Sequence, residues 1–234
     1  GGWFVVVGGV GERRRALLAA VAGRLLGGGT CALALLLALD VSGSVDAEEW
    51  EIQRDGLAAA LRDGLVSEAL VQARAQVALM QWTGTGRQRV TMPWTPVTDF
   101  DDADALATRV AAERRIWRNF STAVGEALEV ALAEMARVPD CRRRVIDVSG
   151  DGRSNEGVPP AEVRARLAAA GVTVNALVIE GDEPDLTGWY WENVITGPGA
   201  FVVSANGYED YPRRIRQKLV RETTRQLSRG APPK

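Results

Sequence analysis

An unbroken apolar run from Leu33 to Leu39 constrains the fold more than any other feature of the sequence. The run shows no alternation of polar and apolar residues, which is typical of a strand buried on both faces in a parallel sheet. It ends abruptly at Asp40, and a helix signature follows, because Asp46 and Glu49 have the spacing of a capping box. In open α/β sheets, ligands bind at the turn between such a strand and its helix, so the Asp40 turn is a candidate site.

The rest of the chain alternates predicted strands and helices, without a repeat or a low-complexity linker. The predicted strands cover residues 33–39, 75–82, 88–92, 144–148, 172–179 and 200–204, and the predicted helices cover residues 47–62, 99–115, 122–137, 160–170, 186–194 and 208–227. The third strand is expected to stop at Pro93, which cannot donate to a ladder. This order predicts a three-layer α/β fold, in which helices cover both faces of a doubly wound, mostly parallel six-stranded sheet.

Composition excludes several classes of function. The chain has no histidine, which rules out Ser-His and Cys-His catalysis and zinc–histidine sites. The formal net charge is −2 and the arginines are scattered, so nothing indicates nucleic-acid binding. A hydrophobic content of 46% in 234 residues is enough for one well-cored domain with short extensions.

Oxygen-bearing side chains alternate along the turn after the first strand. Asp40, Ser42 and Ser44 would point to one side of an extended turn, because side chains two residues apart face the same way. Carboxylate and hydroxyl oxygens suit Mg²⁺ or Mn²⁺ better than zinc. The three residues resemble the D-x-S-x-S motif of von Willebrand factor A (VWA) domains, which is the core of their metal-ion-dependent adhesion site (MIDAS).

Two later segments resemble the rest of the VWA site. Thr122 begins the sequence TAVGEAL, like the family's T-x-x-G-x-A-L pattern, and Asp151 follows VIDVSG as the family's second aspartate follows a strand. The resemblance implies a site for Mg²⁺ or Mn²⁺ formed by Asp40, Ser42, Ser44, Thr122 and Asp151. It also implies the strand order 3-2-1-4-5-6, with one short strand antiparallel.

Four short segments extend the resemblance beyond the site. VSGSV, MQWTG, VIDVSGDG and GPGAFVV are similar to an uncharacterised bacterial VWA subfamily of unknown function. The wider VWA resemblance implies a protein-binding module for adhesion or assembly, in which the metal binds a Glu or Asp carboxylate of a partner protein. On this interpretation the protein is not an enzyme.

Three other interpretations of the site residues stay open. The first is a plain turn that caps a helix. The second is a non-adhesive scaffold subunit of an ATPase-linked complex, as some VWA proteins are. The third is a metal-dependent hydrolase. It is disfavoured because no general base with a second catalytic partner is evident, and Ser42 stands where haloacid-dehalogenase-like phosphatases have their second acid.

Residues 1–30 differ from the rest of the sequence. A basic patch at 13–15, an apolar stretch at 16–26 and three glycines resemble a bacterial export signal, although Arg24 argues against one. A transmembrane helix would have to include the first strand, so membrane attachment is expected only if the N-terminal segment is retained. Export to the periplasm or cell surface is expected, and a cytoplasmic location is the alternative. The expected divisions are an extension over 1–30, a VWA domain over 31–228 and a loose tail over 229–234.

The two cysteines precede the two site aspartates at similar distances along the chain. Cys31 lies nine residues before Asp40, and Cys141 lies ten residues before Asp151. If the two aspartates meet at one ion, the cysteines are neighbours at the far edge of the sheet. A Cys31–Cys141 disulfide would agree with export to an oxidising compartment, and two unpaired buried thiols are the alternative.

Several other residues carry expectations of their own. Asp147 lies mid-strand, where a carboxylate needs a partner; it would either help to hold the Asp40 turn or pair with an arginine. The acidic run from Asp99 to Asp104 is expected to be a helix N-terminus and not a calcium site. The aromatics Trp189 to Trp191 cannot all face one core, so at least one should be exposed. Asn155 to Gly157 flank the site and are candidates for contact with a partner.

Overall fold

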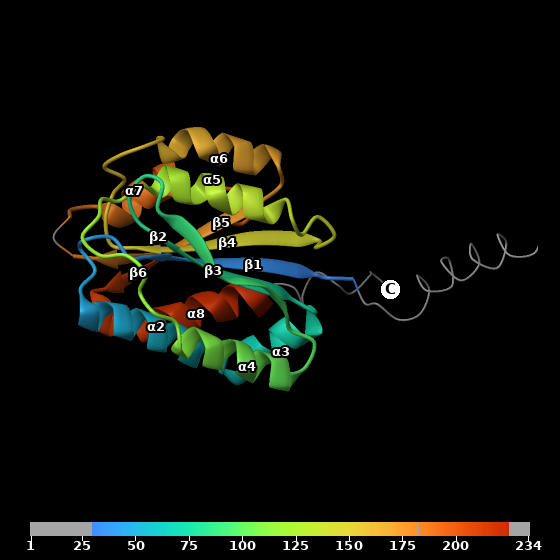
Figure 1. Ribbon diagram of the computed structural model, residues 1–234. Coiled ribbons are helices and arrows are strands. Elements are labelled where there is room, and N and C mark those ends of the chain that lie inside the picture. Colours follow the sequence, from blue (N-terminus) through green and yellow to red (C-terminus); the bar gives the residue numbers. More distant parts are fainter. Residues whose placement is uncertain (1–29, 182, 225–234) are drawn as a thin grey trace, which may run out of the picture. The chain divides into compact units, whose positions relative to one another are not determined.

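The computed structural model describes residues 30–181 and 183–224 (Figure 1). The signal-like extension before residue 30 and the tail at 229–234 lie outside these residues, so both stay predictions, as do the domain limits. Within the described part of the chain, no helix combines the length and the apolar character needed to cross a membrane.

A six-stranded sheet forms the middle layer of the domain (Figure 1). Its strand order is β3-β2-β1-β4-β5-β6, and neighbouring strands are parallel except for β2 and β3. The strands are β1 (Leu33–Asp40), β2 (Gln76–Trp82), β3 (Gln88–Pro96), β4 (Arg143–Gly150), β5 (Thr173–Glu180) and β6 (Val202–Asn206). The predicted strand order and the single antiparallel strand are confirmed.

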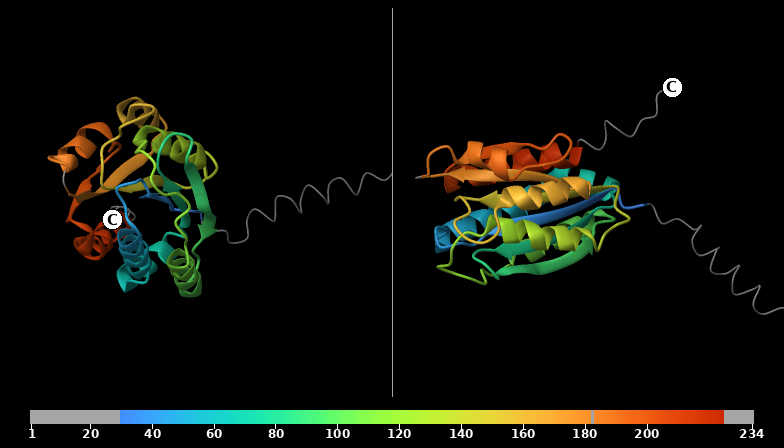
Figure 2. Two further views of the ribbon diagram at one scale, coloured as in Figure 1. Left: turned by 60° about the vertical axis from the view of Figure 1, so that its left-hand side comes forward. Right: turned by 90° about the horizontal axis from the view of Figure 1, so that it is seen from above.

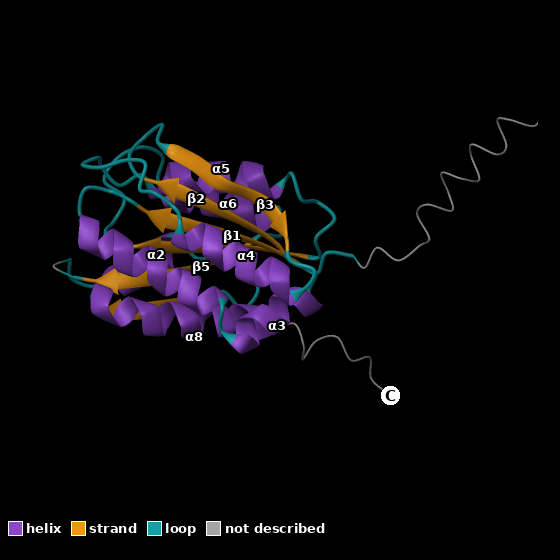
Figure 3. Ribbon diagram, turned by 60° about the horizontal axis from the view of Figure 1, so that its bottom comes forward, coloured by secondary structure: helices purple, strands orange, loops and turns teal. Residues whose placement is uncertain are grey.

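Helices cover both faces of this sheet (Figures 1 and 2). One face carries α5 (Val124–Met135), α6 (Pro160–Ala169) and α7 (Leu186–Asn193), and the other carries α2 (Ala47–Leu61), α3 (Gly64–Gln72), α4 (Phe100–Ala111) and α8 (Tyr211–Thr224). A 3₁₀ turn, η1 (Tyr208–Asp210), precedes α8. On the second face α2 packs between α4 and α8 (Figure 3). The three-layer architecture predicted from the alternation of elements is confirmed.

The packing of β1 explains why its apolar run is continuous. Every residue of β1 is buried, and successive side chains enter opposite cores. The odd-numbered leucines enter the core shared with α2, α3, α4 and α8, whereas Ala34, Leu36 and Ala38 enter the core shared with α5, α6 and α7. Full burial of one leucine side chain contributes about 1.5–3 kcal/mol, so this strand is a main source of stability.

The edge strand β3 is longer than predicted. It continues through Pro93, and the predicted stop at that residue was wrong. Val77 lies opposite Thr95 and Leu79 lies opposite Met92, so β3 has an extra residue at this point. Pro93 falls within this irregularity, where the ladder is interrupted and a missing donor costs little.

Two helix assignments also differ from the prediction. No helix was predicted at α3, a short helix capped by Asp63, whose carboxylate accepts a hydrogen bond from Leu65 N at 3.0 Å. The fourth helix was predicted to reach residue 115, whereas α4 ends at Ala111. The segment that follows crosses to the Asp40 turn, where Arg115 donates hydrogen bonds to backbone carbonyls, and these contacts replace another helical turn.

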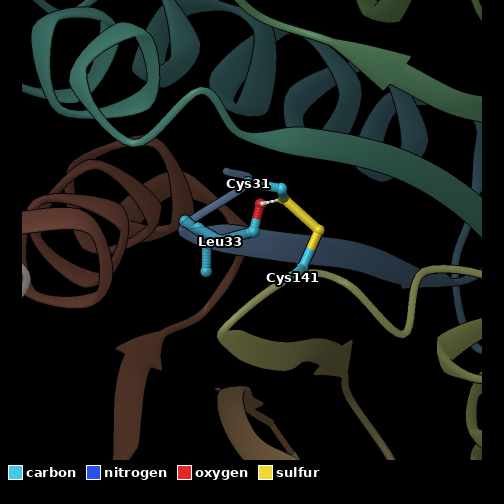
Figure 4. The surroundings of a disulfide bond; sticks show 3 residues. All are labelled: Cys31, Leu33 and Cys141. Atoms are coloured by element: carbon cyan, nitrogen blue, oxygen red, sulfur yellow. Dashed lines mark hydrogen bonds between the residues drawn. A yellow bond between two sulfur atoms is a disulfide. The ribbon is translucent and has the colours of Figure 1, made fainter. Parts of the chain in front are cut away.

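A disulfide joins Cys31 to Cys141 at the amino-terminal edge of β1 and β4 (Figure 4). Their Cα atoms are 4.6 Å apart. The register explains the pairing, because Leu33 lies opposite Arg143 and each cysteine comes two residues earlier. This bond confirms the expected disulfide, and it joins two residues with a sequence separation of 110.

The remaining expectations concern single residues. Asp147 pairs with Lys218, 2.5 Å from its Nζ, so the expected arginine partner was wrong. Asp99 caps α4, which confirms that the acidic run begins a helix. Among the three consecutive aromatics, Tyr190 is buried and Trp191 is 56% exposed, as the prediction required.

Candidate metal centre

The turn after β1 is held by its own groups and by the start of α2. Ser42 N donates a hydrogen bond to Asp40 Oδ1 at 2.7 Å. Asp46 Oδ1 accepts from Glu49 N at 2.8 Å, and Glu49 Oε2 accepts from Asp46 N at 2.7 Å. This reciprocal capping box fixes the exit of the turn, as its spacing predicted.

Hydroxyl and carboxylate groups meet beyond the carboxyl ends of β1 and β4. Ser42 Oγ and Ser44 Oγ are 3.1 Å apart, and Ser44 Oγ donates to Asp151 Oδ1 at 2.7 Å. The strand register produces this meeting, because Leu39 lies opposite Ser149 in the parallel pair. The two chains therefore leave the sheet side by side, one into the Asp40 turn and the other into the Asp151 loop.

The loop before α5 brings Thr122 to the same place. Gly43 N donates to Phe120 O at 2.8 Å, which joins this loop to the Asp40 turn. Asn155 joins it to the Asp151 loop, because Asn155 Oδ1 accepts from Thr122 N at 3.0 Å and Asn155 N donates to Thr122 O at 2.9 Å. Three loops that are distant in sequence are thus tied together by their backbones.

All five residues singled out in the sequence lie at this junction. Ser44, Thr122 and Asp151 line one cleft of about 500 Å³, and Asp40 and Ser42 are buried next to it. Asp40, Ser42 and Ser44 come from one turn, and Thr122 and Asp151 come from two other loops. The convergence is therefore a property of the whole sheet edge and not of the local D-x-S-x-S sequence.

Asp40 is a buried carboxylate whose hydrogen bonding is incomplete among the described residues. It is 1% exposed, and within the described residues its Oδ2 has no hydrogen-bond partner. Burial, followed by the charge of Asp151, raises the pKa of Asp40 to about 8. A divalent cation would supply the positive charge that this buried carboxylate lacks.

The donor set is chemically suited to a hard cation. Two carboxylates and three neutral hydroxyls offer only oxygen, which is what Mg²⁺ and Mn²⁺ prefer. The part of the chain that the structure describes has no group of three or more His, Cys, Asp or Glu side chains arranged to hold a metal. Any metal at this sheet edge would therefore depend on the hydroxyls as well as the acids.

Supporting residues were missed by the sequence analysis. Tyr208 Oη donates to Asp151 Oδ2 at 3.1 Å, and Arg115 donates to Ser42 O at 2.8 Å. Others are Gln53, which donates to the carbonyl of Asp40, and Tyr190, which donates to that of Gly152. No motif marks these residues, because they act through tertiary contacts that sequence spacing does not show.

The residues that flank the Asp151 loop hold neighbouring loops. Asn155 bonds the backbone of Thr122, and Glu156 Oε1 accepts from Thr85 N at 2.6 Å. Both residues are exposed, and their contact with a partner stays a prediction.

The sequence of residues 30–227 matches a family described as protein of unknown function, DUF1194. The chain belongs to this family. No curated protein matches the sequence. The DUF1194 match covers all the strands and helices described above, so it refers to this whole α/β domain.

Solved structures show that this DUF1194 chain has a VWA fold. Proximal thread matrix protein 1 (PTMP1) from the mussel byssus is 18% identical with a TM-score of 0.60, over 81% of this chain and 47% of that one. The pilus adhesin SpaC from Lactobacillus rhamnosus GG is 12% identical with a TM-score of 0.60, over 84% of this chain and 31% of that one. The Rpn10 VWA domain is 13% identical with a TM-score of 0.55, over 82% and 95%.

The likeness to these proteins concerns the fold, because the identities are low. The chain spans about half of PTMP1 and about a third of SpaC. A further PTMP1 structure, 17% identical with a TM-score of 0.58 over 81% of this chain and 48% of that one, has zinc in its MIDAS motif. The predicted VWA fold, in a family of unknown function, is confirmed.

Proposed function

We propose that this domain is a metal-dependent protein-binding module for adhesion or assembly. A divalent ion of the Mg²⁺ or Mn²⁺ type would be held by Asp40, Ser42, Ser44, Thr122 and Asp151. The observation that carries the proposal is the buried Asp40 Oδ2, which lacks a hydrogen-bond partner among the described residues beside four other oxygen-bearing side chains. A buried carboxylate without a counter-charge is costly, and an added cation is the direct way to stabilise it.

The balance of neutral and charged donors supports binding to a partner's carboxylate. Three of the five side chains are hydroxyls, which leave more positive charge on a bound ion than an all-carboxylate site would. Ser44, Thr122 and Asp151 line the open cleft, so an incoming ligand would approach from their side. A Glu or Asp side chain of another protein has the charge and the hard oxygen atoms that such an ion attracts.

The rim of the cleft offers further contact area for a protein. Phe120 lines the cleft and is 37% exposed, and the guanidinium of Arg87 lies 3.8 Å from the centre of its ring. An aromatic side chain with an adjacent arginine is a favourable composition for a protein interface. This rim would add affinity around the central carboxylate–metal contact.

An oxidising compartment follows as part of the same proposal. The Cys31–Cys141 disulfide is the supporting observation, since such bonds persist mainly in exported proteins. We infer export to the periplasm or cell surface, where an adhesive module meets its partners.

Calorimetry tests the metal part of the proposal. Mg²⁺, Mn²⁺ and Zn²⁺ are titrated separately into the wild type, into Asp40→Asn and into the control Asp104→Asn, whose carboxylate is exposed and pairs with Arg62. We expect Asp40→Asn to weaken binding by about 100-fold or more, and Asp104→Asn to bind like the wild type. Equal binding by all three proteins would reject the site.

Capture of a partner tests the second part. The immobilised domain is exposed to extracts of the source cell with Mg²⁺, with EDTA, and as the Asp40→Asn variant. A specific partner is expected only with the wild type and Mg²⁺, and substitution of one Glu or Asp in that partner should abolish capture. A partner retained equally in EDTA would contradict metal-bridged binding.

A further inference from the structure

Three ionisable side chains are sealed between β4 and α8, away from the candidate metal centre. Asp147 lies on β4, and Lys218 and Glu222 lie one turn apart on α8. All three are almost completely buried, and Lys218 is 0% exposed. Lys218 Nζ lies 2.5 Å from Asp147 Oδ1 and donates to Glu222 Oε1 at 2.7 Å.

The choice of lysine at this position is informative. Of 28 basic residues in the sequence, only Lys218 and Lys234 are lysines. Arginine usually serves better in a buried ion pair, because its guanidinium is more weakly hydrated and makes several fixed hydrogen bonds. An amine has one property that a guanidinium lacks in proteins, since it can lose its proton and act as a nucleophile.

The contact between lysine and aspartate is close without being a hydrogen bond. Neither oxygen of Asp147 accepts a hydrogen bond from any residue that the structure describes, although Lys218 Nζ touches one of them. The same amine donates with good geometry to Glu222, whose Oε1 also accepts from Asn175 Nδ2 at 2.8 Å. Asn175 is fixed in turn by Phe201 N, which donates to its Oδ1 at 3.0 Å. Glu222 is thus held in place, while Asp147 is left against the amine.

We infer that Lys218 and Asp147 condense to form an intramolecular isopeptide bond, with Glu222 carrying the protons. Two carboxylates and one ammonium in a sealed core leave excess negative charge, and condensation removes one charge of each sign. The enclosed geometry also makes the reaction unimolecular, and such positioning is worth effective concentrations of about 10⁵–10⁸ M.

The chemistry balances without any added reagent. Lys218 Nζ gives a proton to Glu222, which passes it to an oxygen of Asp147 and makes that carboxyl neutral. The amine lone pair then attacks Asp147 Cγ to form the new C–N bond, the C–O bond breaks, and the hydroxyl leaves as water with the second amine proton. Glu222 ends as it began. Burial, followed by the charge of Asp147, raises the pKa of Glu222 to about 8, so at neutral pH this carboxylate can take up the amine proton and hold it until it is transferred.

The bond would complement the disulfide in the architecture of the domain. The disulfide joins the segment just before β1 to the segment just before β4, and the isopeptide bond would join α8 to β4 itself. The first strand and the last helix would then both be covalently attached to the same central strand. This inference does not depend on the proposed metal site, because none of its residues lies in that cluster.

Mass spectrometry of the full chain tests the inference directly. The folded wild type is incubated at neutral pH, denatured, reduced and weighed; we expect its mass to be lower than that calculated from the sequence by one water. After trypsin digestion, residues 145–153 should be joined to residues 217–221, because the linked Lys218 resists cleavage. A wild type of full calculated mass, with these peptides separate, would overturn the inference.

Two variants separate the roles of the groups. Lys218→Arg keeps the positive charge but cannot form the bond, so its mass should equal the calculated value. Glu222→Gln keeps the size of the side chain but cannot carry protons, and the linked peptides should be lost while circular dichroism shows a folded protein. A mass loss without linked peptides identifies dehydration elsewhere and rejects the bond. Linked peptides in Glu222→Gln would remove the role assigned to Glu222.

Discussion

Asp147 and Asp151 are four residues apart on one stretch of chain, but their carboxylates have opposite surroundings. Asp147 points from β4 into the core under α8, where Lys218 meets it. Asp151 follows the end of β4, faces the cleft, and accepts hydrogen bonds only from the hydroxyls of Ser44 and Tyr208 among the side chains described. One acid has a cation built into the fold, and the other has neutral donors and an open side.

This contrast separates structural charge from charge available to a ligand. A buried acid that pairs with a cation of the same chain needs no added ligand. Substitution of either partner should therefore lower the free energy of unfolding. Asp151 is surrounded by hydroxyls and lies beside Asp40, whose Oδ2 has no hydrogen-bond partner among the described residues, so an added cation would stabilise both acids. The two regions should therefore respond differently to the same kind of substitution.

Removal of the internal cation should have the largest effect. Lys218→Met removes the amine that contacts Asp147 and Glu222 and, with it, the inferred bond. Both carboxylates then stay buried without this amine, and we expect the free energy of unfolding to fall by about 3–5 kcal/mol. Urea denaturation measures the change. The control is Arg54→Met, which removes an exposed ion pair with Asp55 and should change stability by about 0–1 kcal/mol. A loss in Lys218→Met no larger than in this control would contradict a structural role for the sealed charges.

The sealed charges also show where sequence reasoning reached its limit. A carboxylate in the middle of an apolar strand indicated that Asp147 needed a partner, but its partner lies 71 residues away on α8. Lys218 lies on the buried face of α8 with Ile215 and Leu219, but in the sequence alone a lysine in a helix is expected to be exposed. The fold was easier to predict from the sequence than the partner of Asp147, because the continuous apolar run of β1 and the alternation of strands and helices each indicate a parallel sheet.

Neutralisation of Asp40 should have an effect of opposite sign. In the metal-free protein, Asp40→Asn removes a buried carboxylate that has an unpartnered oxygen among the described residues, and we expect stability to rise by about 1–3 kcal/mol. Added Mg²⁺ should stabilise the wild type and leave the variant unchanged. The matched variant Asp147→Asn should lose stability in both conditions. If Asp40→Asn also loses stability in EDTA, the open cluster is structural like the sealed one.

Loss of one supporting hydroxyl should have a smaller effect. Tyr208→Phe removes the hydrogen bond to Asp151 Oδ2, and we expect a loss of about 0.5–1.5 kcal/mol with metal affinity reduced by about 10-fold. Thr98→Val is the control, because it removes a hydroxyl that bonds the carboxylate of Asp102, which is not a proposed ligand. Calorimetry should show weaker metal binding for Tyr208→Phe alone, and an equal effect in both variants would remove the special role of Tyr208.

The candidate site was partly visible in the sequence for a physical reason. Asp40, Ser42 and Ser44 sit on one turn, so their spacing is fixed by the local backbone. Thr122 precedes a helix and Asp151 follows a strand, so the motifs around both residues could also be recognised in the sequence. Tyr208 reaches Asp151 only because η1 and the end of β4 lie together in the folded sheet, and no short-range pattern encodes that meeting.

A half-buried acid at the start of α8, Asp210, provides the weakest test of the contrast between sealed and open charges. Hydrogen bonds from Arg214, then Asn206 N and Arg213, lower the pKa of Asp210 to about 2. A folded-state pKa below the unfolded value means that the stabilisation is complete above about pH 4 and is lost as the pH falls toward 2. Asp210→Asn should therefore lower the melting temperature slightly at neutral pH, less than any variant above, with the difference vanishing in strong acid. A difference that persists in acid would show that Asp210 acts through the shape of its hydrogen bonds to the backbone before α8, and not through its charge.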